Sequence, residues 1–182
     1  MTTRLLLVRH AESTWNALGR WQGQANPPLS ETGRRQAKAV AQDLAGMPAA
    51  RLLASDLARA VETAGAIGRR LRLAPELDPG LRELDVGDWS GRTRSEIEAR
   101  DADRLARFEA EEPEVAAGGA ESRADIRRRV RATFAGYAAR FPDTDLIVVT
   151  HLGVVRALLP GTELENTGVA TWALDADWAS RA

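Results

Sequence analysis

Two histidines, His10 and His151, are the only imidazole side chains in the 182-residue chain, and both occur in the same sequence context. Each follows a short apolar run typical of a buried parallel strand, residues 4–8 in one case and 145–150 in the other. Ligands of open α/β sheets bind outside the carboxyl ends of the strands. We therefore expect both imidazoles to face one crevice, although 141 positions separate them. A structural role for each histidine is the alternative.

The elements that position these residues alternate between strand and helix. The predicted strands span residues 4–8, 51–54, 145–150 and 169–174. The predicted helices run from a Ser30 cap to Gly46, from a Ser55-Asp56 cap to about residue 71, over 93–112, from a Ser122 cap to about 140, and over 153–159. This alternation predicts an α/β fold, a three-layer sandwich in which a mostly parallel, mixed sheet is flanked by helices. Residues 1–182 are expected to form a single domain.

Composition excludes several classes of protein. The chain has no cysteine, which removes thiolate nucleophiles, disulfides, zinc fingers and iron–sulfur clusters. A net charge of −1 gives no overall field for nucleic acid or an anionic membrane, so neither is expected as a partner. The apolar runs are too short to span a bilayer, so we expect a cytoplasmic protein. The arginines at 127, 128, 129 and 131 are predicted to form a solvated surface paired with the acidic segment 109–114.

Four short blocks carry a family resemblance. They are Arg9-His10-Ala11-Glu12, the segment 55–60 (Ser-Asp-Leu-Ala-Arg-Ala), Leu81-Arg82-Glu83, and Thr150-His151-Leu152-Gly153. In this order they make the chain similar to the histidine phosphatase superfamily, also called the phosphoglycerate mutase-like family. The similarity runs from about residue 4 to 159 and extends towards 166–168.

The resemblance implies a role for each matched residue. His10 would be the nucleophile, His151 its companion and Glu83 the proton donor. Arg9 and Arg59 would bind phosphate. Further substrate-binding residues would be Asn16, Gln22 and Leu152.

Physical chemistry supports these roles separately. A neutral imidazole nitrogen can attack phosphorus in line, forming a phosphohistidine that water then hydrolyses, and this chemistry requires neither a metal nor another cofactor. Guanidinium groups and a second imidazole supply fixed positive charge for the phosphoryl oxygens. Arg59 is expected in the first turn of its helix, where the helix dipole also favours an anion. A carboxylic acid such as Glu83 can protonate the leaving alkoxide and then activate water.

The sequence departs from the family pattern at three small residues. Ala11 and Leu152 stand where the family usually has glycine after each histidine, and Ala120 replaces one glycine of a Gly-Gly-Glu-Ser loop. Alanine avoids positive φ, so the conformation of that loop is a point for the structure to decide. Glu12 is left outside the catalytic set.

These observations favour a phosphomonoester hydrolase that acts on a small phosphorylated metabolite. A phosphoglycerate mutase-type phosphotransferase is an alternative, but such enzymes shield the intermediate with extra segments and a compact chain favours hydrolysis. A non-catalytic phosphate-binding module is a second alternative. A metal hydrolase using both histidines with carboxylates such as Glu83 is a third, and it is disfavoured because no H-E-x-x-H spacing occurs. No oligomeric state is assigned.

Overall fold

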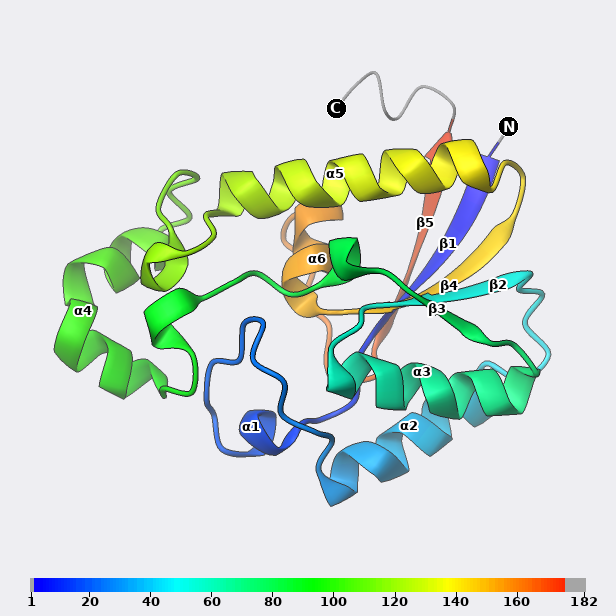
Figure 1. The fold of residues 1–182 in the computed structure, drawn as a ribbon, viewed down its shortest axis with the longest axis horizontal. Coiled ribbons are helices and arrows are strands. Elements are labelled where there is room, and N and C mark those ends of the chain that lie inside the picture. Colours follow the sequence, from blue (N-terminus) through cyan, green and yellow to red (C-terminus); the bar gives the residue numbers. More distant parts are fainter. Residues whose placement is uncertain (1, 176–182) are drawn as a thin grey trace.

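A five-stranded mixed sheet forms the centre of the molecule in a computed structural model that describes residues 2–175 (Figure 1). The strand order is β3-β2-β4-β1-β5, and β5 alone runs antiparallel to its neighbour. The strands are β1 (Thr2–Arg9), β2 (Arg51–Ala54), β3 (Pro75–Leu77), β4 (Asp145–Thr150) and β5 (Val169–Asp175). The predicted mostly parallel sheet is confirmed.

Helices cover both faces of this sheet, as the three-layer prediction required. The helices are α1 (Thr14–Ala17), α2 (Glu31–Asp43), α3 (Ala58–Leu71), α4 (Arg94–Glu109), α5 (Arg123–Arg140) and α6 (Leu152–Leu158). Figure 1 shows α2 and α3 together on one side of the strands and α5 with α6 on the other. Within residues 2–175, no helix is both long and apolar enough to cross a membrane.

The apolar run of β1 is continuous because both of its faces are buried. Leu5 and Leu7 belong to the core cluster that includes α5 and α6. Leu6 and Val8 point the other way and pack with α2 and α3. The pairing with β4, from Arg4 opposite Asp145 to Arg9 opposite Thr150, sets the register of β1. The strand therefore delivers His10 to a defined place beyond its end.

Most predicted helix starts are confirmed, and one is wrong. Ser30 and Ser122 each cap their helix by accepting a backbone N–H bond. The prediction that Ser55 and Asp56 cap α3 is incorrect: Leu57 occupies the N-cap position and makes no side-chain cap bond. The hydroxyl of Ser55 instead lies in hydrogen-bond contact with His151.

Two short elements, β3 and α1, were not predicted. Ala120 adopts a φ of −101°, while Gly118 and Gly119 take the left-handed conformation, so the loop requires no positive φ at the alanine.

The predicted pairing of the α5 arginines with the acidic segment 109–114 is incorrect. Arg128 pairs with Asp125, and Arg129 pairs with Glu121. The arginines at 127, 128 and 131 are exposed, whereas Arg129 turns inward.

Candidate active site

His10 and His151 lie side by side because the strands that precede them are neighbours. β1 and β4 pair in parallel, so both strands deliver their following residue to the same edge of the sheet. The backbone N–H of His10 donates to the carbonyl of Thr150 across 2.9 Å. The two imidazole centroids are 5.0 Å apart, and both rings are buried. The predicted convergence of the two histidines on one place is thus observed.

The surroundings of His10 fix its tautomer. Its Nδ1 lies 2.7 Å from the carbonyl oxygen of Ala11, which can only accept, so Nδ1 carries the proton. The lone pair of the neutral ring is therefore on Nε2. Burial, with the charge of Arg59 as a second cause, lowers the pKa of His10 well below its usual value. His10 is consequently neutral at pH 7 and presents an unprotonated Nε2.

His151 is held by a hydrogen-bond contact at its Nε2. Its Nε2 is 2.8 Å from the hydroxyl of Ser55, the residue that follows β2. Its Nδ1 is buried and has no hydrogen-bond partner within the described residues. Burial, followed by the charge of Arg59, lowers the pKa of His151 well below its usual value. This Nδ1 is an unsatisfied buried polar atom next to His10.

Arg59 is a fully buried cation directed at His10. It lies in the first turn of α3, as predicted, and its Nε donates to His10 Nε2 across 3.3 Å. Its two remaining nitrogens donate to the carbonyls of Ala25 and Gly23, each at 2.8 Å. Burial lowers the pKa of Arg59 to about 10, so it remains charged at neutral pH. The carbonyl bonds fix its plane, because a guanidinium presents its donors in a rigid fork.

A cavity of about 380 Å³ opens beside these groups. Of the eight residues predicted for the site, seven line it, namely Arg9, His10, Asn16, Gln22, Arg59, Glu83 and Leu152. The expectation that both imidazoles face the cavity is wrong for His151, which does not line it although its ring lies next to that of His10. Arg9 donates from one terminal nitrogen to Leu164 O, and its buried Nε has no partner in the described part of the chain. An anion in this cavity would therefore meet unsatisfied donors and positive charge.

The carboxylate of Glu83 is held at the opposite wall by backbone N–H groups. Leu84 donates to Oε1 at 2.8 Å, and Gly153 donates to Oε2 at 3.3 Å. The N–H of Gly153, in the first turn of α6, is therefore directed to Glu83. The first turn of α6 thus positions a carboxylate beside the cavity.

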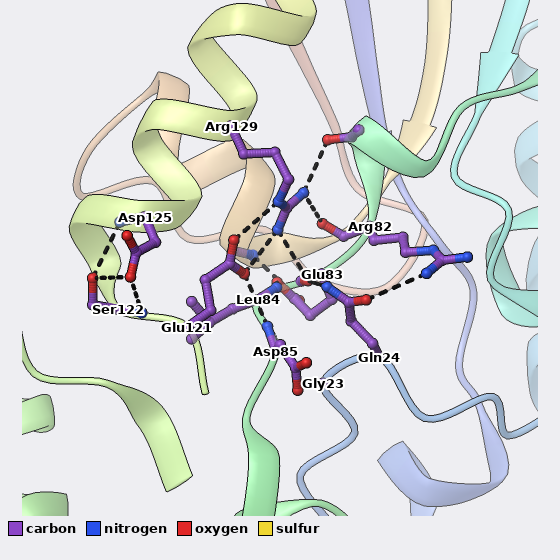
Figure 2. Close-up of polar contacts among 12 residues, drawn as sticks. Gly23, Gln24, Arg82, Glu83, Leu84, Asp85, Glu121, Ser122, Asp125 and Arg129 are labelled. Atoms are coloured by element: carbon purple, nitrogen blue, oxygen red, sulfur yellow. Dashed lines mark hydrogen bonds and ion pairs between the residues drawn. The ribbon is translucent and has the colours of Figure 1, made fainter. Parts of the chain in front are cut away.

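The main chain of Glu83 is fixed by the Arg129–Glu121 ion pair, which sequence reasoning missed (Figure 2). Arg129 donates to the carbonyls of Gly80, Arg82 and Glu83 at 2.8 to 3.2 Å. Its remaining two N–H groups bind both carboxylate oxygens of Glu121 at 2.8 and 2.9 Å. All five donors of Arg129 are therefore satisfied, and they bind the loop that carries Glu83 to α5.

Glu121 also binds the backbone next to Glu83. Its Oε2 accepts the backbone N–H of Asp85 at 3.0 Å, and Gln24 donates to the carbonyl of Glu83 at 3.3 Å. The Arg129–Glu121 pair is largely shielded, with 24% and 14% of the side chains exposed. A buried bidentate pair of this kind restrains the backbone around it.

Asn16 and Gln22 reach the cavity from the segment after β1. Asn16 accepts the backbone N–H of Ser13, and Gln22 accepts the hydroxyl of Ser13 at 2.6 Å. Glu12, left outside the catalytic set, accepts the hydroxyl of Ser30 and does not line the cavity. In residues 2–175, no group of three or more His, Asp or Glu side chains is placed to hold a metal ion.

Two of the missed residues carry a weak sequence signal. Ser55 follows a strand, as His10 and His151 do, so its position predicts that it lies at the same sheet edge as the two histidines. Arg129 is three positions from the buried Ile126 on α5, at the border of the apolar face. Glu121 has no comparable signal apart from its place in the glycine loop.

Comparison with known proteins places these features in a family. Residues 5–177 match the profile of the "Histidine phosphatase superfamily (branch 1)". Glucosyl-3-phosphoglycerate phosphatase of Mycobacterium tuberculosis is 36% identical over 177 residues, covering 93% of this chain and 78% of that protein. The metal-independent phosphoserine phosphatase of Arabidopsis thaliana is 38% identical, covering 86% and 67%. A solved mycobacterial glucosyl-3-phosphoglycerate phosphatase complexed with VO3 superimposes with a TM-score of 0.87 at 32% identity, covering 97% and 94%.

Proposed function

The chain belongs to the histidine phosphatase superfamily, and we propose that it hydrolyses a phosphomonoester of a small metabolite through a phosphohistidine intermediate on His10. The observation that carries this proposal is the unprotonated Nε2 of His10, which faces Arg59 at the edge of a cavity lined by cations. A nucleophile of this kind needs neither a thiolate nor a metal.

In the first step, the Nε2 lone pair of His10 forms a bond to phosphorus while the ester P–O bond breaks. Glu83, as the carboxylic acid, gives its proton to the departing oxygen. Arg9 and Arg59, which line the cavity, meet the negative charge spread over the phosphoryl oxygens, and the buried His151 next to His10 is the companion of the nucleophile.

In the second step, the carboxylate of Glu83 takes a proton from water. The water oxygen forms the new bond to phosphorus, and the P–N bond breaks to restore the lone pair of His10. Inorganic phosphate leaves, and Glu83 is again the acid. The cycle balances with one water consumed for each ester cleaved.

The substrate class is supported by the relatives, which are named as phosphatases of glucosyl-3-phosphoglycerate and of phosphoserine. We propose a small phosphorylated metabolite for this chain and a cytoplasmic location, where such metabolites are found. The absence of cysteine is compatible with that reducing compartment.

A phosphatase screen over a metabolite panel with EDTA present tests the proposal. The wild-type protein should release phosphate and form a phosphoprotein that is labile in acid and stable in base. His10→Ala should do neither. Arg131→Gln, an exposed change on α5, is the matched control and should behave as wild type. A His10→Ala protein with normal turnover would refute the nucleophile.

The same assay separates the alternatives. A phosphotransferase would transfer the phosphoryl group to an alcohol acceptor, so phosphate release would fall short of substrate loss. A non-catalytic module would bind phosphate esters without releasing phosphate.

A further inference from the structure

A second cavity of about 390 Å³ adjoins the one that holds His10. The two cavities share six lining residues: Trp21, Leu84, Phe108, Arg123, Gly153 and Arg156. A ligand with its phosphate against His10 can therefore extend into the second cavity. The shared residues determine which functional group the part of the ligand beyond its phosphate can have.

Arg123 is the most incompletely paired cation at this junction. Its guanidinium carbon lies 4.4 Å from the centre of the Phe108 ring, and one terminal nitrogen donates to the Phe108 carbonyl at 3.3 Å. Its Nε is buried and has no partner among residues 2–175. The facing carboxylate of Glu111 is 3.9 Å away, beyond hydrogen-bond distance. Arg123 is thus held in place by the ring and the carbonyl of Phe108, and its Nε is not used.

The surroundings of Arg123 favour an incoming anion. Burial is the main cause that lowers the pKa of Arg123; the charge of Glu111 raises it, and the charges of Arg156 and Arg127 lower it. Arg156 lines the first cavity together with Arg9, whose pKa is lowered mainly by burial and also by the charge of Arg156. Positive charge therefore continues from the phosphate end of the cavity, through Arg9 and Arg156, to Arg123. Arg156 is already paired with Glu163, whereas Arg123 keeps a buried Nε that has no partner among residues 2–175.

We propose that Arg123 binds a carboxylate of the same substrate whose phosphate lies against His10. The site would then select phosphomonoesters that carry a carboxylate group. This inference rests on the proposed phosphatase function and adds the chemical class of its substrate. Arg123 is in this view a specificity-determining residue, separate from the groups that act on phosphorus.

A carboxylate fits this position better than a second phosphate. One guanidinium with unused donors matches the two oxygens of one carboxylate. Glu109, Glu111 and Glu163 also line the second cavity and would repel a dianion more strongly than a monoanion. Beyond the carboxylate, these acidic side chains can accept bonds from hydroxyl or ammonium groups of the substrate.

The test compares 3-phosphoglycerate with glycerol 3-phosphate, which replaces the carboxylate by a hydroxymethyl group. Arg123→Gln should lower kcat/KM for 3-phosphoglycerate by about 10- to 100-fold, as expected for a lost hydrogen-bonded charge. The same change should alter kcat/KM for glycerol 3-phosphate by less than about threefold. Arg131→Gln, on the same helix and exposed, should leave both values unchanged.

Glu111→Gln provides a second variant that removes no packing, since Glu111 is exposed. Removing its charge should raise kcat/KM for 3-phosphoglycerate by about two- to threefold and leave glycerol 3-phosphate unchanged. Arg123→Lys keeps the charge and should retain part of the preference for the carboxylate. An equal loss on both substrates in Arg123→Gln, or no loss on either, overturns the proposal.

Binding measured without turnover separates this inference from the proposed function. In a His10→Ala background, calorimetry should give a tighter Kd for 3-phosphoglycerate than for glycerol 3-phosphate, and Arg123→Gln should remove the difference. If selective binding occurs but the wild-type protein hydrolyses neither ester, the phosphatase proposal fails and the carboxylate site stands. If hydrolysis occurs without selective binding, the carboxylate site fails alone.

Discussion

Arg59 Nε donates to His10 Nε2, the nitrogen proposed to attack phosphorus, across 3.3 Å. The bond is long for an N–H donor, whereas the other two nitrogens of Arg59 make 2.8 Å bonds to carbonyls. The guanidinium is therefore anchored by the carbonyls and only loosely engaged by the imidazole. A phosphoryl oxygen that enters the cavity can replace His10 as the acceptor and leave Nε2 free to attack.

This relationship predicts a distinctive result for Arg59→Met. Loss of a preorganised charged donor should lower kcat by about 10²- to 10³-fold. The charge of Arg59 also lowers the pKa of His10, so its removal should raise that pKa. The acidic limb of the pH profile of kcat/KM should therefore move to higher pH, whereas Arg59→Lys, which keeps a charge, should move it less. An unshifted limb in Arg59→Met would contradict this electrostatic role.

The two buried histidines also predict how stability depends on pH. The pKa values of His10 and His151 lie well below 6.5 in the folded protein, whereas both are near 6.5 in the unfolded chain. Below pH 6.5 the unfolded state therefore binds more protons, and the free energy of unfolding should fall as pH decreases. The slope of the free energy of unfolding against pH can reach at most about 1.4 kcal/mol per pH unit for each histidine.

Urea unfolding between pH 7.5 and 5.5 measures this effect above the titration range of ordinary carboxylates. Stability should be nearly constant down to about pH 6.5 and then decline. His10→Gln should reduce the slope in the acidic window by about half. A slope that does not change in this variant would show that His10 is not neutral and buried in solution.

The Arg129–Glu121 pair predicts an effect that depends on the leaving group. If the pair positions Glu83, then Arg129→Lys and Glu121→Gln should impair proton donation. The value of kcat/KM, which reports formation of the phosphoenzyme, should fall by about tenfold or more for glycerol 3-phosphate. It should fall much less for p-nitrophenyl phosphate, whose leaving group needs no proton. Arg128→Lys, an exposed neighbour, is the control, and equal losses on both substrates would indicate a general structural role.

Sequence reasoning succeeded where local pattern and topology agree. The apolar runs before His10 and His151 are buried on both faces, so periodicity identified the strands. The rule that ligands bind at strand carboxyl ends then brought the two imidazoles together. Arg59 was identified through the family resemblance, and its expected place in the first turn of the helix after residues 55–56 agrees with the structure.

The remaining features depend on partners that are distant in the sequence. Arg129 is one of several arginines on α5, and only the path of residues 80–83 shows which of them turns inward. Serine is a common helix-cap residue, so the sequence predicted a cap at Ser55. Its contact with His151, 96 positions away, can be seen only in the folded structure. β3 has three residues and pairs only with β2, so no periodicity marks it.

Gly153 and Gly136 offer a paired test of how tightly Glu83 is held. A Cβ on Gly153 would lie far inside van der Waals distance of Glu83 Oε1, whereas a Cβ on Gly136 would meet nothing. Gly153→Ala should therefore displace the Glu83 carboxylate and lower kcat/KM for glycerol 3-phosphate by at least about tenfold, approaching the loss in Glu83→Gln.

Gly136→Ala should leave activity unchanged and raise the free energy of unfolding by about 0.5–1 kcal/mol, because alanine favours the helix over glycine. Thermal unfolding of both variants shows whether the Gly153→Ala protein remains folded while it loses activity. A folded Gly153→Ala enzyme with full activity on glycerol 3-phosphate would mean that the observed position of Glu83 is not required for proton transfer.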